Sequence, residues 1–197
     1  MHTTTRSQNW FWGGEEPEWL VVLTLVIALA LGAALVYGLA AQTSALTLQG
    51  ASVRYPADWH ASTASESGAL RAGPALGARA GVALQVLRDL DPAAPVTLDE
   101  LAAQREFAAA QTLDAYRTLS SESKALDGKS GLLVRYAYVQ EAPGRRQQAT
   151  LPAVIVGMAW IGTSNGKAYV ISLEDEAAGF AANERRYLAI LNGARLR

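Results

Sequence analysis

The sequence offers few side chains that could do chemistry, and none stands in a recognisable catalytic arrangement. The only histidines are His2, in the N-terminal tail, and His60, which follows Asp58 and Trp59 at an expected turn. A metal site built on one histidine needs two or three further ligands from elsewhere. A serine hydrolase needs a base beside its nucleophile, and no G-x-S-x-G elbow is present. We therefore predict no catalytic residue and interpret His60 as exposed or structural.

Two groups of acidic residues could supply hard oxygen ligands for Ca²⁺ or Mn²⁺. They are Glu174-Asp175-Glu176 and the pair Asp89 and Asp91. An acidic run just before a helix is more simply explained by its attraction to the positive end of the helix dipole. The glycines from Gly73 to Gly81 lack the lysine of a phosphate-binding loop. The sequence thus predicts no metal site and no bound cofactor.

The composition excludes further classes. The chain has no cysteine, which rules out disulfides, thiolate zinc sites, iron–sulfur clusters and covalent haem attachment, and fits an oxidising compartment. Its net charge is −1, and the largest basic cluster is Arg145-Arg146 in an expected hairpin loop. No basic surface for nucleic acid is predicted.

Three tyrosines alternate with aliphatic residues in expected strands: Tyr136, Tyr138 and Tyr169. They could line a ligand cleft. We interpret them instead as core residues whose hydroxyl groups lie near the rim of the core, where they can find hydrogen-bond partners.

The most conspicuous element is an uncharged stretch between Glu18 and Arg54. Residues 19–41 are predicted to form a single transmembrane helix, because about 20 apolar residues cover the ~30 Å hydrocarbon core. The acidic residues before it and its length argue against a cleaved signal peptide. Arg6 precedes the stretch and no Lys or Arg follows it before Arg54. The positive-inside rule therefore places the tail, residues 1–18, in the cytoplasm and the C-terminal domain outside the cell (inner) membrane.

Two features of this region indicate neighbours. Small residues that could pack against another membrane helix recur at four-residue spacing, namely Ala28 and Gly32, and Ala30, Ala34 and Gly38. Aromatic residues that favour the membrane interface precede or begin the helix, namely Trp10, Phe11, Trp12 and Trp19. The predicted partners are the lipid bilayer and other membrane subunits.

After a linker of residues 42–45, residues 46–197 are predicted to form one domain. A capping box, Thr97 to Glu100, opens a helix that runs to about Tyr116, and a second helix covers Ala177 to Asn192. Turn residues separate the expected strands, which are Leu46 to Tyr55 with a break at Gly50, Gly81 to Leu87, Ser121 to Leu126, Leu132 to Gln140, Val154 to Ile161 and Ala168 to Leu173. Asn165-Gly166 between two apolar runs predicts a tight hairpin turn. The strand Leu132 to Gln140 is apolar on both faces, which predicts a central strand covered on both sides. An antiparallel sheet with segregated helices is an α+β fold, here an α/β/α sandwich.

Three segments carry a resemblance to a known family. Val53 to Trp59, VRYPADW, resembles the opening of the PsbP-like superfamily, which is named for the extrinsic oxygen-evolving protein of photosystem II. Asn165 to Ser172 is similar to its late strand, and Phe180, Tyr187 and Ile190-Leu191 are similar to its closing helix. The resemblance implies an α/β/α sandwich over residues 46–197. It also implies a domain that docks on photosynthetic or electron-transfer machinery without carrying a cofactor.

Three functions follow as hypotheses. The first is a non-catalytic, single-pass accessory subunit that stabilises a membrane complex of photosynthetic or respiratory electron transfer. The second is a free-standing, membrane-anchored extracytoplasmic factor that binds a ligand or assists assembly. The third is a membrane-tethered hydrolase that uses His60 or an acidic pair.

Overall fold

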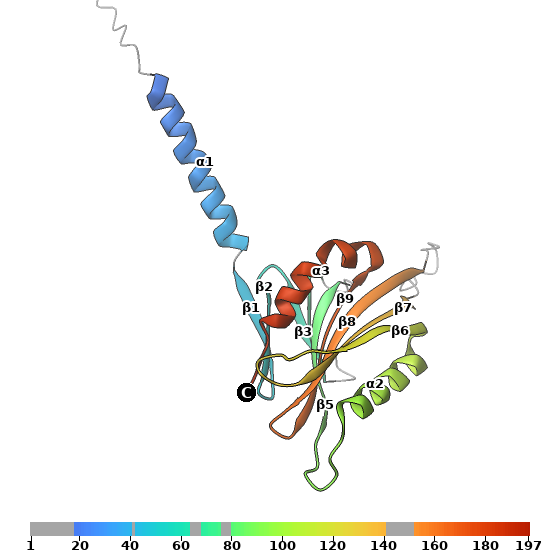
Figure 1. Ribbon diagram of the computed structural model, residues 1–197. Coiled ribbons are helices and arrows are strands. Elements are labelled where there is room, and N and C mark those ends of the chain that lie inside the picture. Colours follow the sequence, from blue (N-terminus) through green and yellow to red (C-terminus); the bar gives the residue numbers. More distant parts are fainter. Residues whose placement is uncertain (1–17, 41, 64–67, 76–79, 141–151) are drawn as a thin grey trace, which may run out of the picture. The chain divides into compact units, whose positions relative to one another are not determined.

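The computed structural model describes residues 18–40, 42–63, 68–75, 80–140 and 152–197 (Figure 1). The chain divides into two compact units, Met1–Gln42 and Thr43–Arg197, which we describe separately. The predictions made for His2, Trp10, Phe11, Trp12 and Arg145-Arg146 lie outside the described residues.

The described part of the first unit is formed by helix α1 (Glu18–Ala40), at the position of the predicted segment 19–41. Its described side chains are Trp19 and those of residues 21–34; apart from Thr24 they are apolar, and all are exposed. Among the described residues, no helix has the length and apolar character needed to cross a membrane.

A seven-stranded antiparallel sheet forms the centre of the second unit (Figure 1). In spatial order its strands are β3 (His60–Thr63), β4 (Leu70–Gly73), β5 (Gly81–Asp89), β9 (Lys167–Glu176), β8 (Ala153–Ser164), β7 (Gly131–Gln140) and β6 (Asp114–Ser123). After β5 the chain forms α2 (Leu98–Thr112) and re-enters the sheet at its far edge as β6. Three successive antiparallel pairings then bring β9 back beside β5.

A second sheet of three strands, together with one helix, covers one face of the large sheet. It consists of β1 (Thr43–Leu48), β2 (Ala51–Pro56) and β10 (Arg195–Leu196), and the helix is α3 (Ala177–Asn192). Helix α2 covers the opposite face. The core is therefore split into two layers, one around Trp160 and Tyr187 and the other around Tyr136 and Leu101.

Alternation along the central strands explains the two layers. Successive side chains of a strand point to opposite faces, and β7 is apolar on both. Its Leu133 is buried on the α3 side, whereas Val134 and Tyr136 are buried on the α2 side. The prediction of central strands covered on both sides is confirmed, as is the α+β class with a large antiparallel sheet.

Local signals for turns and caps are also confirmed. Asn165 and Gly166 have φ of 48° and 70°, as a tight hairpin between β8 and β9 requires. Thr97 and Glu100 form the reciprocal capping box at the start of α2, and α3 has the predicted limits.

Four predictions of element limits were wrong. The expected strand Ser121 to Leu126 overlaps only the end of β6, which covers Asp114–Ser123. Strand β1 begins at Thr43, inside the predicted linker 42–45, because Thr43 pairs with Pro56 of β2. The expected strand Leu46 to Tyr55 is two strands, joined by a turn at Gly50. Helix α2 ends at Thr112 instead of about Tyr116, because β6 pairs with β7 from Asp114 onward.

A buried carboxylate joins the end of β9 to α3. The Asp175 side chain accepts a hydrogen bond from the Tyr187 hydroxyl at 2.7 Å and another from the backbone N–H of Glu176 at 2.8 Å. Burial, and then the hydrogen bond to the charged Asp175, raise the pKa of Tyr187, so the phenol stays a donor. Gly179 lies against this pair, since a Cβ on it would be 2.5 Å from Oδ2 of Asp175.

Replacing Gly179 with alanine should therefore destabilise the domain, although alanine normally favours a helix by about 1 kcal/mol over glycine. We expect the free energy of unfolding to fall by about 1–3 kcal/mol, as for an overpacked core. Urea unfolding of the full chain in mild detergent, followed by circular dichroism, measures this. The double variant Gly179→Ala/Tyr187→Phe should lose less free energy of unfolding than the two single variants lose together, because both changes act on Asp175. Stabilisation by Gly179→Ala would contradict the prediction.

Candidate functional site

Polar side chains converge around Glu174 on the α2 face of the large sheet. Its Oε1 accepts a hydrogen bond from the Tyr136 hydroxyl at 2.7 Å, and its Oε2 accepts one from the Tyr138 hydroxyl at 3.3 Å. Arg71 adds an ion pair, with Nη2 at 3.7 Å from Oε2. Because the Glu174 side chain is only 17% exposed, these groups take over much of the solvation that water would provide.

The register of three neighbouring strands explains how Tyr136 reaches Glu174. Tyr136 on β7 is paired with Gly157 on β8, which is in turn paired with Glu174 on β9. Gly157 has no side chain, so the tyrosine ring can lie across β8. A Cβ at Gly157 would be 2.6 Å from Cζ of Tyr136.

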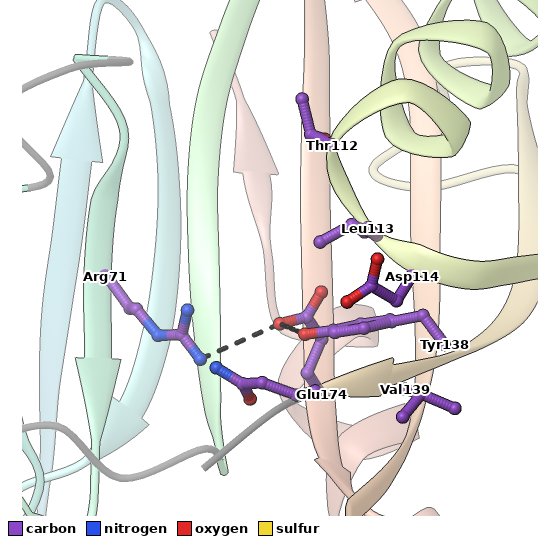
Figure 2. A pocket seen from close by; sticks show the side chains of 8 residues that line it. Arg71, Thr112, Leu113, Asp114, Tyr138, Val139 and Glu174 are labelled. Atoms are coloured by element: carbon purple, nitrogen blue, oxygen red, sulfur yellow. Dashed lines mark hydrogen bonds and ion pairs between the residues drawn. The ribbon is translucent and has the colours of Figure 1, made fainter. Parts of the chain in front are cut away.

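Small residues on the intervening strand β5 also explain how Arg71 reaches Glu174 from β4. Arg71 is paired with Ala83, and Gly81, two residues earlier on β5, is paired with Glu174. These two small residues leave the α2 face of β5 open. Figure 2 shows Arg71 extending toward the carboxylate of Glu174.

Arg105 of α2 closes the network from above the sheet. Its guanidinium carbon lies 4.6 Å from the centre of the Tyr136 ring, and its Nη1 donates to the Tyr116 hydroxyl at 3.4 Å. The rings of Tyr116 and Tyr136 are stacked with centroids 5.6 Å apart. Burial lowers the pKa of Arg105, but the interactions with Tyr136, Tyr116 and Glu174 outweigh it, so the guanidinium stays charged.

Tyr136 is the most strongly perturbed group of this network. Burial, and then the negative charge of Glu174, raise its pKa well above the ordinary value of 10.0. The phenol therefore remains a proton donor to Glu174 and does not act as a base.

A cavity of about 460 Å³ lies beside Glu174 (Figure 2). Eight residues line it: Arg71, Thr112, Leu113, Asp114, Tyr138, Val139, Gln140 and Glu174. None of these is a histidine, cysteine, lysine or serine, and the Thr112 hydroxyl donates within its own helix to the carbonyl of Ala108 at 3.1 Å. The cavity presents one arginine and two carboxylates, which are groups that bind polar partners.

The structure separates the predicted acidic groups. Alternation along β9 sends Glu174 to the α2 face and Asp175 to the α3 face, while Glu176 occupies the N-cap position of α3. Asp89 pairs with Lys167, and Asp91 accepts a hydrogen bond from the Ala93 N–H at 2.8 Å in a local turn. Within the part of the chain that the structure describes, no group of three His, Cys, Asp or Glu side chains could hold a metal ion.

The other predicted candidates lie apart from Glu174. His60 is exposed at the start of edge strand β3 and does not line the cavity. Tyr169 points to the α3 face, where its hydroxyl donates to the carbonyl of Gln49 at 2.7 Å. Trp19, Ala28, Ala30, Gly32 and Ala34 belong to α1, as does the backbone of Gly38.

Sequence reasoning missed Arg71, Asp114 and Gly157. Arg71 belongs to a four-residue strand with no periodic signal, and Asp114 was placed inside a helix. A glycine inside an otherwise apolar strand is a signal for the close approach of a neighbouring group, and it was available for Gly157.

Comparison with known proteins yields structural similarity only. No protein-family model and no curated protein matches the sequence. The cyanobacterial PsbP protein CyanoP of Synechocystis sp. PCC 6803 aligns with a TM-score of 0.58 at 11% identity, over 79% of this chain and 92% of its own. A Pseudomonas aeruginosa protein of unknown function aligns with a TM-score of 0.46 at 12% identity, over 77% of this chain and 94% of its own. LpqN of Mycobacterium tuberculosis, involved in cell envelope biogenesis, aligns with a TM-score of 0.42 at 13% identity, over 79% and 90%.

Replacing Tyr136 with phenylalanine should weaken the domain and its pH response. The change removes the shorter phenol hydrogen bond to Glu174, so we expect the free energy of unfolding to fall by about 1–3 kcal/mol. As pH rises above about 10, the unfolded chain releases the Tyr136 proton before the folded chain does, so stability declines. Urea unfolding between pH 7 and about 11 should show a steeper decline for the wild type than for Tyr136→Phe.

The control for this measurement is Tyr169→Phe. It removes a phenol hydrogen bond from the opposite face and leaves Tyr136 in place. Its stability should decline with pH as steeply as that of the wild type. Identical pH profiles for the wild type and Tyr136→Phe would contradict the raised pKa of Tyr136.

Proposed function

We propose that this chain, whose residues 43–197 have the PsbP-like fold, is a membrane-anchored, non-catalytic accessory subunit of a larger membrane complex. The resemblance seen in Val53 to Trp59 is confirmed for the fold, because CyanoP aligns over most of the domain. Fold does not fix function, so the proposal depends on the features of this chain.

The exposed apolar surface of α1 carries the proposal. Large side chains on several sides of the helix are well exposed, among them Leu29 at 66%, Val21 at 64% and Leu25 at 61%. A helix that is apolar all round requires an apolar environment, either protein or lipid. The sequence continues apolar and uncharged to Ala41, which gives about 20 residues for a bilayer.

The charges beside this helix support one orientation. Arg6 precedes it, whereas no Lys or Arg follows it before Arg54. We place the tail in the cytoplasm and the PsbP-like domain outside, in keeping with the absence of cysteine.

Small residues on α1 support lateral packing against other subunits. A Cβ at Gly32 would meet nothing within 4 Å, so the space beside this glycine is open in the isolated chain. Small residues of this kind allow the backbones of two membrane helices to approach closely. The assignment to photosynthetic or respiratory electron transfer rests on the superfamily resemblance alone.

The network around Glu174 supports a role without catalysis. Its carboxylate accepts hydrogen bonds from two tyrosines and pairs with Arg71, so its lone pairs serve the fold.

The orientation can be measured directly because the chain has no cysteine. Single-cysteine variants at Ser7, in the tail, and at Asp58, exposed in the domain, are treated on intact cells with a membrane-impermeant maleimide. We expect Asp58→Cys to be labelled and Ser7→Cys to be protected. Both should react once the membrane is permeabilised, which serves as the control. Extraction of the wild-type chain by alkaline carbonate would contradict the anchor, and labelling of Ser7→Cys alone would reverse the orientation.

Association with other subunits is tested by gentle solubilisation and native electrophoresis. The wild-type chain should migrate with a larger complex, and Gly32→Leu should shift to the monomer because its side chain enters the space that a neighbouring helix needs. The matched control Leu23→Phe adds volume on the opposite side of α1, because nine residues separate it from Gly32, and it should leave the complex intact. Migration of the wild type as a monomer would contradict the accessory role and favour a free-standing ligand-binding factor.

A further inference from the structure

A second cavity, of about 490 Å³, lies on the same face of the large sheet, between α2 and β5. It shares Thr112 and Leu113 with the cavity beside Glu174, but the rest of its lining differs. Its volume falls within the range of sites that bind small molecules. Neither the fold nor the accessory role requires this cavity.

An irregularity of β5 places a charge in this cavity. Gln85 and Val86 pair with successive residues of β9, but the next residue in register is Arg88, opposite Ala168. Leu87 is the extra residue of a β-bulge, and the bulge brings Arg88 to the α2 face that Gln85 already occupies. Regular alternation would send Arg88 to the α3 face instead. Bulges that redirect a side chain in this way are frequent beside functional sites.

One donor of Arg88 is not satisfied by the residues around it. Its Nε is buried and has no hydrogen-bond partner among the described residues. A buried donor without an acceptor is unfavourable, and an unexplained one in a folded protein calls for a missing partner. An anion entering the cavity would provide acceptors for the Arg88 guanidinium. The Nε itself is closed to solvent, so it would reach the anion only after a rotation of the side chain.

The charge of the cavity fits the same ligand. Arg105 also lines it, and none of its lining residues is acidic. Glu100 is near enough to Arg88 to feel its charge, but its carboxylate accepts a hydrogen bond from the Thr97 N–H at 2.8 Å in the capping box. Arginine is the side chain best suited to carboxylate recognition, because its planar fork matches the two oxygens.

The remaining lining of the cavity is mostly aliphatic, which favours a ligand with an apolar part. Leu87, Leu101 and Leu113 contribute apolar surface, while Gln85 and Gln104 add neutral polar groups. A small inorganic anion would leave this apolar surface uncovered. We propose that the cavity binds a monocarboxylate with an aliphatic chain, whose carboxylate contacts Arg88 and Arg105 and whose chain lies against the leucines.

Isothermal titration of the full chain in lipid nanodiscs with octanoate tests the proposal, with empty nanodiscs to subtract partitioning into lipid. We expect saturable binding that weakens about tenfold or more in Arg88→Gln, because a charged hydrogen bond is lost. The control Arg54→Gln removes an exposed arginine from β2, in the small sheet, and should bind like the wild type. Octylamine, which has the same tail and the opposite charge, should not bind.

A second pair of variants keeps both arginines. Its outcome therefore does not depend on whether the domain folds with Arg88→Gln. Ala108 lines the cavity, whereas Ala110, on the same helix, does not. Ala108→Phe should abolish octanoate binding, and Ala110→Phe should preserve it, with circular dichroism confirming that both fold.

Several results would overturn the inference. They are equal octanoate affinity in Arg88→Gln and Arg54→Gln, binding of octylamine as tight as that of octanoate, and unchanged binding in Ala108→Phe. Inorganic phosphate that binds as tightly as octanoate would identify the cavity as a simple anion site and exclude the aliphatic part of the ligand.

Discussion

Strand β9 imposes the main constraint on this domain. It is hydrogen-bonded to β5 on one edge and β8 on the other, and both of its faces are covered. Alternation therefore sends the consecutive carboxylates Glu174 and Asp175 into opposite layers of the core, where each must find donors to offset its desolvation. Tyr136 and Tyr138 provide them on the α2 face, and Tyr187 of α3 provides one on the other. Three phenol–carboxylate contacts thus connect the central strand to both layers.

The sequence predicts the parts of the fold that depend on local chemistry. The capping box at Thr97, the Asn165-Gly166 turn and the two-sided burial of β7 all follow from neighbouring residues, and all are confirmed. Strands β3 and β4 have four residues each and owe their existence to pairing, which leaves no periodic pattern to detect. The positions of Arg71 and Arg88 could not be predicted for the same reason, because one depends on an unpredicted strand and the other on a bulge in the register.

The α2 face is divided by charge. The cavity beside Glu174 has two carboxylates and one arginine in its lining, whereas the cavity along β5 has two arginines and no acidic residue. The end of α2 lines both cavities. Arg105 contacts the tyrosine network and also lines the second cavity. The tyrosine network is therefore a rigid support for one of the two arginines that face the second cavity.

The three-stranded sheet affects how the domain folds during its synthesis. Ala51 of β2 pairs with Leu196 of β10, and the Arg197 N–H donates to the carbonyl of Gly50 at 2.9 Å. The β1–β2 hairpin leaves the ribosome early, yet its outer partner arrives only after the whole large sheet has been synthesised. Pairings so distant along the chain are slow to form. During translation the hairpin thus exposes an unpaired strand edge, a feature that makes a folding chain prone to wrong pairing until β10 arrives.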